Sequence, residues 1–86
     1  MLFNVYVLQC NDGTCYVGMT SDLKRRMQQH EYGQVFYTKI RLPVKLIFVE
    51  QANDRKAARV REKYWKSGAG REKLKRITAD LPMGKA

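Results

Sequence analysis

An arginine on the apolar side of a helix is the feature of this sequence that most constrains its chemistry. Leu23, Met27 and His30 recur at i, i+4 and i+7, which predicts the buried stripe of a helix over residues 22–31. Arg26 lies at the edge of that stripe, four residues before His30. Because burying an unpaired charge is costly, a guanidinium directed toward an apolar face needs an anionic partner. The alternative is an arginine that reaches back to solvent, and spacing alone favours it.

Cys10 and Cys15 do not predict a metal site. A C-x4-C spacing without a second pair, in a chain with one histidine, does not match structural zinc ligation. The thiols fit a reducing compartment, and residues 1–9 lack the basic region and cleavage site of a signal peptide. No stretch approaches the roughly 20 apolar residues of a transmembrane helix. We therefore expect a cytoplasmic protein that does not insert into membranes.

The elements that position these residues predict a small α/β domain in the order β-β-α-β-α-α. Its sheet is expected to be three-stranded, mainly antiparallel and flanked by helices. The expected strands cover residues 2–10, 14–19 and 44–50, and the expected helices cover residues 22–31, 53–67 and 71–77. We assign residues 1–77 to one domain and residues 78–86 to a flexible tail.

Two details of the second half are open to direct comparison with a structure. Residues 34–43 are expected to form a basic loop, and the segment Gly68-Ala69-Gly70 is expected to break the helices apart. On the helix over residues 53–67, one apolar stripe is predicted to face the core and a second lies beside it. The predicted core stripe is Ala57, Val60 and Tyr64, and the adjacent one is Ala58, Glu62 and Trp65.

The charge of the chain favours a polyanionic partner. Seventeen Lys and Arg residues against eight Asp and Glu give a formal net charge of +9. Nucleic acid is the partner that such an excess most often serves. A basic protein that is merely soluble, or one attracted to an anionic membrane surface, remains an alternative on charge alone.

Taken together, the motifs resemble those of the GIY-YIG nuclease superfamily. The resemblance covers residues 3–77 and is carried by VYVLQC, GTCYVGMTSDLKRRMQQHEYG and AARVREKYWKSGAGREKL. More narrowly, the chain is similar to short single-domain bacterial proteins related to the N-terminal nuclease domain of the excision-repair endonuclease. The string YVG-x-T-x-D-L-x-x-R-x-x-x-H-x-x-G is specific, whereas Y-x-G alone would not be.

The resemblance implies a metal-dependent endonuclease with one site. The residues that fall on its motif positions are Tyr6, Tyr16, Arg26, His30 and Glu62. In the family, the glutamate holds a single divalent cation, Mg²⁺ or Mn²⁺, together with substrate phosphate. The first tyrosine helps to deprotonate the attacking water, and the arginine binds the scissile phosphate. Taken singly, each of these residues also has an ordinary structural explanation.

The implied partner is DNA, with RNA as an alternative. The expected contacts to the phosphate backbone are Lys24, Arg25, Lys39, Arg41 and Lys45, although a solvated basic face explains them almost as well. We expect a preference for a DNA structure or for single strands, in repair or processing, or a protein partner that delivers the domain. The sequence leaves the oligomeric state open.

Three departures from the family pattern leave a second function open. Asn4-Val5-Tyr6 lacks the usual glycine, Met19 replaces a lysine of the excision-repair relatives, and no asparagine follows Glu62. A nucleic-acid-binding module of the same fold that does not cut is therefore the main alternative. A protein-interaction domain using Phe36, Tyr37 and Trp65 is a weaker one.

The implied site also demands a particular hairpin. Tyr6 and Tyr16 share a face only if the loop has three residues, with Gly13 at positive φ. That register pairs Tyr6 with Gly18, which leaves room for the tyrosine ring, and it predicts no Cys10–Cys15 disulfide.

Overall fold

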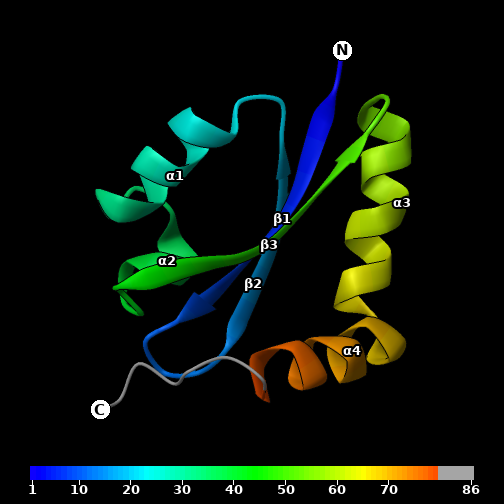
Figure 1. Cartoon of the computed structure of the whole chain (residues 1–86). Helices are drawn as coiled ribbons and strands as arrows, with labels where there is room; N and C mark the ends of the chain where they lie inside the picture. Colours follow the sequence, from blue (N-terminus) through cyan, green and yellow to red (C-terminus); the bar gives the residue numbers. More distant parts are fainter. Residues whose placement is uncertain (80–86) are drawn as a thin grey trace.

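Three strands form the centre of the fold, where the β-forming segments predict them. The computed structural model describes residues 1–79. Its strands are β1 (Phe3–Cys10), β2 (Cys15–Thr20) and β3 (Val44–Ala52). They lie in the order β2-β1-β3, and both neighbouring pairs are antiparallel (Figure 1). The central β1 is therefore hydrogen-bonded on both sides.

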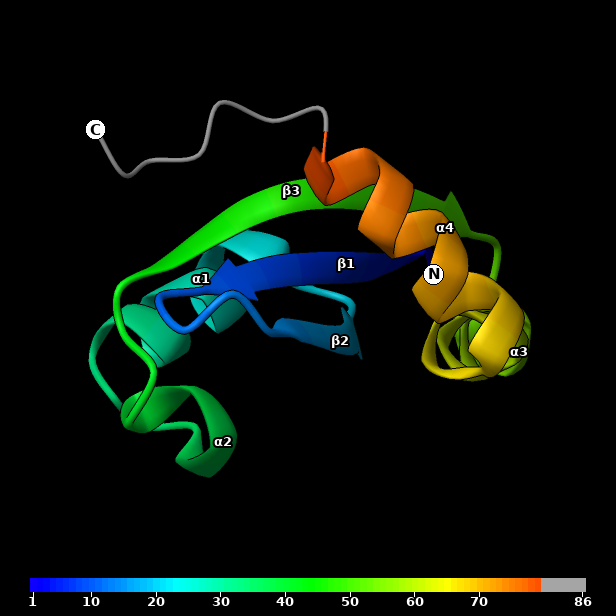
Figure 2. The ribbon, with the colours of Figure 1, turned by 90° about the horizontal axis from the view of Figure 1, so that it is seen from below.

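Helices cover both faces of this sheet. One face carries α1 (Leu23–Glu31) and α2 (Phe36–Lys39), and the other carries α3 (Arg55–Lys66) and α4 (Gly68–Ala79) (Figures 1 and 2). Helices α1 and α3 each begin at an aspartate cap. The side chain of Asp22 accepts a hydrogen bond from the Arg25 amide at 3.1 Å, and that of Asp54 accepts one from the Ala57 amide at 2.8 Å.

The second half differs from the sequence prediction at three points. The expected loop over residues 34–43 contains the short helix α2. The two helices are separate, as expected, but the break lies at Ser67, which takes an extended conformation. Gly68-Ala69-Gly70 instead forms the first turn of α4, where the Gly70 amide donates to the Ser67 hydroxyl at 3.3 Å. The helix α4 continues to Ala79, two residues into the predicted tail. Residues 80–86 of that tail lie outside the described residues.

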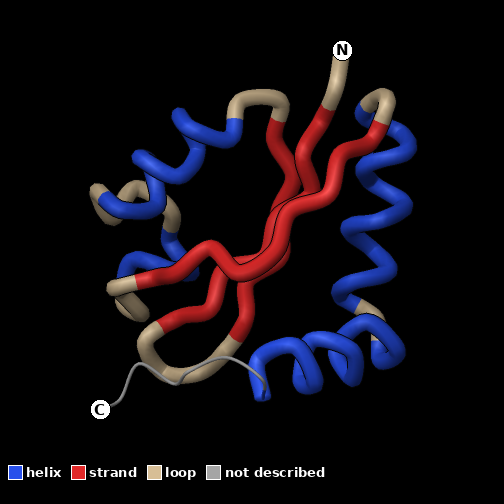
Figure 3. The backbone as a smooth tube through the Cα atoms, in the orientation of Figure 1, coloured by secondary structure: helices blue, strands red, loops and turns tan. Residues whose placement is uncertain are grey.

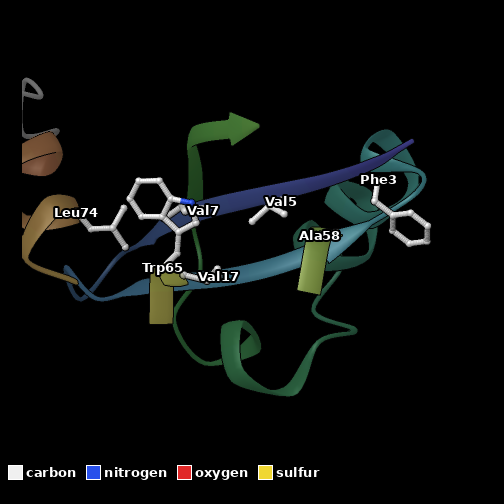
Figure 4. Packing of buried hydrophobic residues seen from close by; sticks show 7 residues of the cluster. All are labelled: Phe3, Val5, Val7, Val17, Ala58, Trp65 and Leu74. Carbon is white, nitrogen blue, oxygen red and sulfur yellow. The ribbon is translucent and has the colours of Figure 1, made fainter. Parts of the chain in front are cut away.

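The hydrophobic core lies between the sheet and the α3–α4 pair. Its buried cluster is Phe3, Val5, Val7, Val17, Ala58, Trp65 and Leu74 (Figure 4). The predicted core stripe of α3 is wrong, because Val60 is 62% exposed while Ala58 and Trp65 are buried. Glu50 explains this rotation of the helix. Its carboxylate accepts a hydrogen bond from the Trp65 indole at 2.7 Å and from the Arg61 guanidinium at 2.8 Å.

The hairpin between β1 and β2 has the register that a shared tyrosine face requires. Tyr6 is paired with Gly18 and Leu8 with Tyr16, and Gly13 has a φ of +88°. Figure 3 shows the loop that joins these strands, and the Cys10 amide closes it by donating to the Thr14 carbonyl at 2.8 Å. The three-residue loop is confirmed, and both cysteines are free.

The face of the sheet toward α1 and α2 is more polar. It receives the side chain of Tyr6 from β1 and that of His30 from α1, both fully buried, together with Thr38 from α2. None of the helices within residues 1–79 is long and apolar enough to cross a membrane.

Candidate active site

The phenol of Tyr6 is the centre of a polar cluster between β1 and α1. Its hydroxyl lies 2.9 Å from Nε2 of His30 and accepts a hydrogen bond from Nε of Arg26 at 3.2 Å. The ring reaches this position by lying across β2 at Gly18. A Cβ atom at that glycine would lie 2.5 Å from the tyrosine hydroxyl, so only glycine leaves the space.

The directions of the hydrogen bonds around His30 follow from Arg26 and Thr38, the groups at the two ends of this series of hydrogen bonds. Arg26 can only donate, so the Tyr6 hydroxyl accepts from it and donates its own hydrogen to Nε2 of His30. At the other end, the Thr38 hydroxyl donates to the carbonyl of Val35 at 3.4 Å. Nδ1 of His30 therefore carries the hydrogen and donates to the Thr38 hydroxyl at 2.8 Å.

Burial keeps both ring systems of this cluster uncharged. It raises the pKa of Tyr6 to about 12, although the hydrogen bond from Arg26 opposes the shift. Burial also lowers the pKa of His30 to about 4, and the positive charge of Arg26 adds to that effect. At neutral pH the phenol is thus protonated, the imidazole is neutral, and Arg26 carries the positive charge of the cluster.

The partners of Arg26 differ from the anionic partner that the sequence suggests. Besides Tyr6, the guanidinium donates through Nη1 to the side-chain oxygen of Gln29 at 2.9 Å. Both oxygens are neutral, and Arg26 takes part in none of the ion pairs within residues 1–79. A cation held in a fixed orientation by neutral groups suits an anion that arrives from outside.

Tyr16 extends the cluster toward the surface. Its ring lies 6.3 Å from the ring of Tyr6 and 5.1 Å from that of His30, measured between centroids. On another side it lies 5.6 Å from the ring of Tyr37, which belongs to α2. The two tyrosines of the hairpin therefore share one face and one aromatic cluster.

Glu62 approaches the cluster from α3. Its side chain is 16% exposed and lies between Arg59, at 3.4 Å, and Lys66, at 3.3 Å. Its negative charge contributes to the raised pKa of Tyr6, which means that the carboxylate lies within electrostatic range of the phenol. The structure thus brings Tyr6, Tyr16, Arg26 and His30 together, whereas Glu62 on α3 is linked to them only by the effect of its charge on Tyr6.

The donor set suits a divalent cation only with help from other ligands. Among residues 1–79 there is no group of three His, Cys, Asp or Glu side chains that could hold a metal ion. One carboxylate is nevertheless a common protein contribution to Mg²⁺, which keeps several waters and takes further oxygens from a phosphate substrate. Glu62 is the residue that fits this role.

A comparison of the sequence with known families decides the membership of this chain. The sequence model described as the GIY-YIG catalytic domain matches residues 2–75. The chain belongs to the GIY-YIG family. The resemblance seen in the motifs is confirmed, and with it a fold of the nuclease type.

Individual relatives agree with this assignment. The GIY-YIG chain is 44% identical over 71 residues to a UPF0213 protein of Streptococcus agalactiae, with 81% of each chain covered. It is 42% identical over 77 residues to a UPF0213 protein of Natronomonas pharaonis, covering 88% of this chain and 89% of the relative. The solution NMR structure of a UPF0213 protein from Bacillus halodurans superposes with a TM-score of 0.57 at 31% identity, covering 93% and 86% of the two chains.

The predicted phosphate contacts of the GIY-YIG domain have different surroundings. Lys24, Arg25, Lys39 and Lys45 are exposed. Arg41 instead donates to Asp12 at 3.1 Å and to the carbonyl of Tyr37 at 2.7 Å, and its guanidinium lies 4.0 Å above the Tyr37 ring. These contacts assign Arg41 a part in fixing α2.

Three residues of the cluster were missed by sequence reasoning. Gln29 orients Arg26, Thr38 holds His30, and Tyr37 packs on Tyr16. The need of a buried imidazole for a second partner was a signal for Thr38, but nothing in the spacing indicates that α2 supplies it.

A basic stripe along α3 was also missed. Its members Lys56, Arg59, Lys63 and Lys66 are exposed and recur at helical spacing beside Glu62. The spacing was visible in the sequence, but the core side of the helix was predicted one position away from its true place.

Proposed function

We propose that this GIY-YIG domain is a divalent-metal-dependent endonuclease that hydrolyses DNA phosphodiester bonds in repair or processing. The observation that carries the proposal is the cluster in which Arg26 and His30 both bind the Tyr6 hydroxyl, on which the charge of Glu62 also acts. It combines a cation for phosphate, a relay of proton-transfer groups and a carboxylate for a metal ion. Those are the parts that phosphodiester hydrolysis requires.

Arg26 is the proposed phosphate-binding group. The contacts to Tyr6 and Gln29 use Nε and Nη1 and fix the plane of the guanidinium. Its remaining N–H donors can bind phosphate oxygens as a fork, without the entropy loss of orienting a free side chain. Tyr16 lines the same space and orients the phosphate through its hydroxyl.

Tyr6 and His30 form the proposed proton relay. The Tyr6 side chain is fully buried, so the relay requires the cluster to open and admit the attacking water. The Tyr6 oxygen then accepts a proton from that water while its own proton passes to Nε2 of His30. In the free protein burial, and to a smaller extent the charge of Arg26, lower the pKa of His30, which makes the imidazole a poor proton acceptor. A phosphate bound to Arg26 offsets that charge, so the imidazole becomes a better acceptor when substrate is present.

Glu62 is the proposed protein ligand for Mg²⁺ or Mn²⁺. Such an ion would neutralise charge on the phosphate and stabilise the leaving oxygen. The carboxylate is held in place by Arg59 and Lys66, one on each oxygen.

Cleavage of labelled DNA tests the proposal. Wild type is incubated with single-stranded, duplex and branched DNA in the presence of Mg²⁺ or Mn²⁺, beside Glu62→Gln. The matched control is Glu72→Gln, because Glu72 is 72% exposed and its one ion pair within residues 1–79 is with Lys75 at 3.8 Å. We expect cleavage of at least one substrate by wild type and the control, and at least a roughly hundred-fold loss with Glu62→Gln.

The other outcomes separate the alternatives. If wild type cleaves no substrate beyond those that Glu62→Gln also cleaves, the proposed enzyme activity is refuted. If DNA binding remains salt-sensitive and unchanged in that variant, a binding module of the same fold is supported instead. The same panel, extended to RNA, defines the preferred structure and whether a partner protein must deliver the domain.

A further inference from the structure

A pocket opens at the edge of β2, beside the proposed catalytic cluster. Its volume is about 210 Å³. The side chains that define its character are Tyr16, Tyr37, Trp65, Leu74, Lys66 and Arg71. They come from β2, α2, α3 and α4, so the pocket has lining residues from helices on both faces of the sheet. Figure 2 shows α2 on one face and α3 and α4 on the other. Three of the six are aromatic.

The aromatic walls of this pocket are held rigidly. Tyr37 lies between the Tyr16 ring and the guanidinium of Arg41, which is itself paired with Asp12. Trp65, which also lines the pocket, is 3% exposed and its indole donates to Glu50 at 2.7 Å. Rigid aromatic walls favour a flat, apolar ligand, because little side-chain entropy is lost when it binds.

The rim of the pocket is positively charged. Lys66 reaches from it to Glu62 at 3.3 Å, and Arg71 donates from it to the carbonyl of Lys66 at 3.3 Å. The pocket therefore shares Tyr16 with the proposed phosphate site and touches the proposed metal ligand through Lys66. A flat apolar group joined to a phosphate fits this combination of walls and rim.

We propose that the pocket is a base-binding subsite, which receives one unpaired nucleobase next to the phosphate held at Arg26. The inference rests on the proposed function and adds a positioning element to it. Aromatic side chains bind bases of any sequence, since every base has an apolar face. A base paired inside a duplex cannot enter, so the strand that is cut must present an unpaired nucleotide at this one position.

Binding and cleavage test the subsite separately. For binding, Glu62→Gln protein without divalent metal is titrated with single strands that carry the fluorescent base aminopurine at successive positions. For cleavage, wild type with Mn²⁺ is given the same strand with one abasic site at successive positions. We expect one position next to the cut to show fluorescence quenching, and loss of its base to lower kcat/KM roughly ten-fold.

Variants of Tyr37 connect that position to the pocket. The variant is Tyr37→Ala, or Tyr37→Leu if the first does not fold. It is expected to abolish the fluorescence quenching and to cleave intact and abasic strands at the same rate. The matched control is Tyr32→Ala, because Tyr32 is 76% exposed and does not line the pocket, and it should behave as wild type.

Failure of the subsite and failure of the nuclease are distinguishable. Quenching at one position that Tyr37→Ala abolishes, with no cleavage of any DNA, refutes hydrolysis and leaves the subsite standing. The subsite is overturned if no abasic position changes the rate of cleavage. It is also overturned if Tyr37→Ala matches Tyr32→Ala in both measurements.

Discussion

At the scale of single residues, the site depends on a buried hydroxyl that satisfies two neighbours at once. The Tyr6 oxygen accepts from Arg26 and its hydrogen goes to His30. Within residues 1–79, no buried side-chain nitrogen or oxygen lacks a partner. Removing one atom of this cluster therefore leaves another unsatisfied, and stability and activity are coupled at the same atom.

Replacing Tyr6 by phenylalanine separates the hydroxyl from the ring. We expect Tyr6→Phe to lower the free energy of unfolding by about 1–3 kcal/mol, because His30 and Arg26 each lose a partner. Cleavage should fall by about a hundred-fold or more, since the proton relay is broken. Chemical denaturation and single-turnover cleavage measure the two effects. Tyr32→Phe, at an exposed tyrosine, should change neither. Full activity in Tyr6→Phe would exclude the relay.

The neutral state of His30 predicts a pH dependence of stability. Its pKa is about 4 in the folded protein against 6.5 ordinarily, so between these values the unfolded state binds more protons. Stability contributed by the neutral imidazole is thus present above pH 6.5 and is lost as pH falls toward 4, by at most about 3 kcal/mol. Thermal melts of wild type and His30→Gln across this window check it. The difference in melting temperature between wild type and His30→Gln should shrink as pH falls. A difference that stays constant would contradict the buried neutral histidine.

At the scale of elements, the hairpin decides whether the two tyrosines can meet. The three-residue loop sets the register, and Gly18 provides the space that the Tyr6 ring fills. A shift of one residue would send Tyr16 to the opposite face of the sheet.

Gly18→Ala tests this use of space. An added Cβ would lie 2.5 Å from the Tyr6 hydroxyl and 2.6 Å from Cζ, so the ring must move away from its partners. We expect a loss of about 1–3 kcal/mol in stability and a larger relative loss of cleavage rate. The control is Gly68→Ala, where nothing lies within 4 Å and helix propensity favours alanine. A Gly18→Ala protein that keeps both hydrogen bonds, seen in its structure, would refute the account.

Helices and strands could be predicted from the sequence where local signals determine them. They were harder to predict where tertiary contacts determine which side of an element is buried. Strand runs, helical periodicity and the glycine at positive φ are local signals, and they predicted β1, β2 and α1 well. The core side of α3 is set by Glu50, eleven residues before Arg61, and no periodicity reveals that contact. The resemblance to the family supplied the candidate site residues, but the part played by α2 became visible only in three dimensions.

At the scale of the whole molecule, positive charge is distributed unevenly around the sheet. Ten of the seventeen Lys and Arg residues lie between Arg55 and Arg76, on α3 and α4. The candidate site lies on the β2 side of the sheet. The basic stripe of α3 runs beside Glu62, the proposed metal ligand of that site. Lys45, one of the predicted phosphate contacts, is on β3 at the opposite edge of the sheet. We therefore expect the DNA backbone to follow α3 rather than β3.

Paired substitutions distinguish these two paths of the DNA. The variant Lys56→Gln with Lys63→Gln removes two exposed charges of α3 that take part in none of the ion pairs within residues 1–79. Each lost phosphate contact should lower the slope of log K against log salt by about 0.7–0.9, so binding weakens most at low salt. Lys45→Gln is the matched control and should leave the slope unchanged. Salt titrations of single-stranded DNA binding, made in the Glu62→Gln background to prevent cleavage, measure both. A slope that falls with Lys45→Gln but not with the α3 pair would move the DNA path to β3, away from the basic stripe and the pocket beside it.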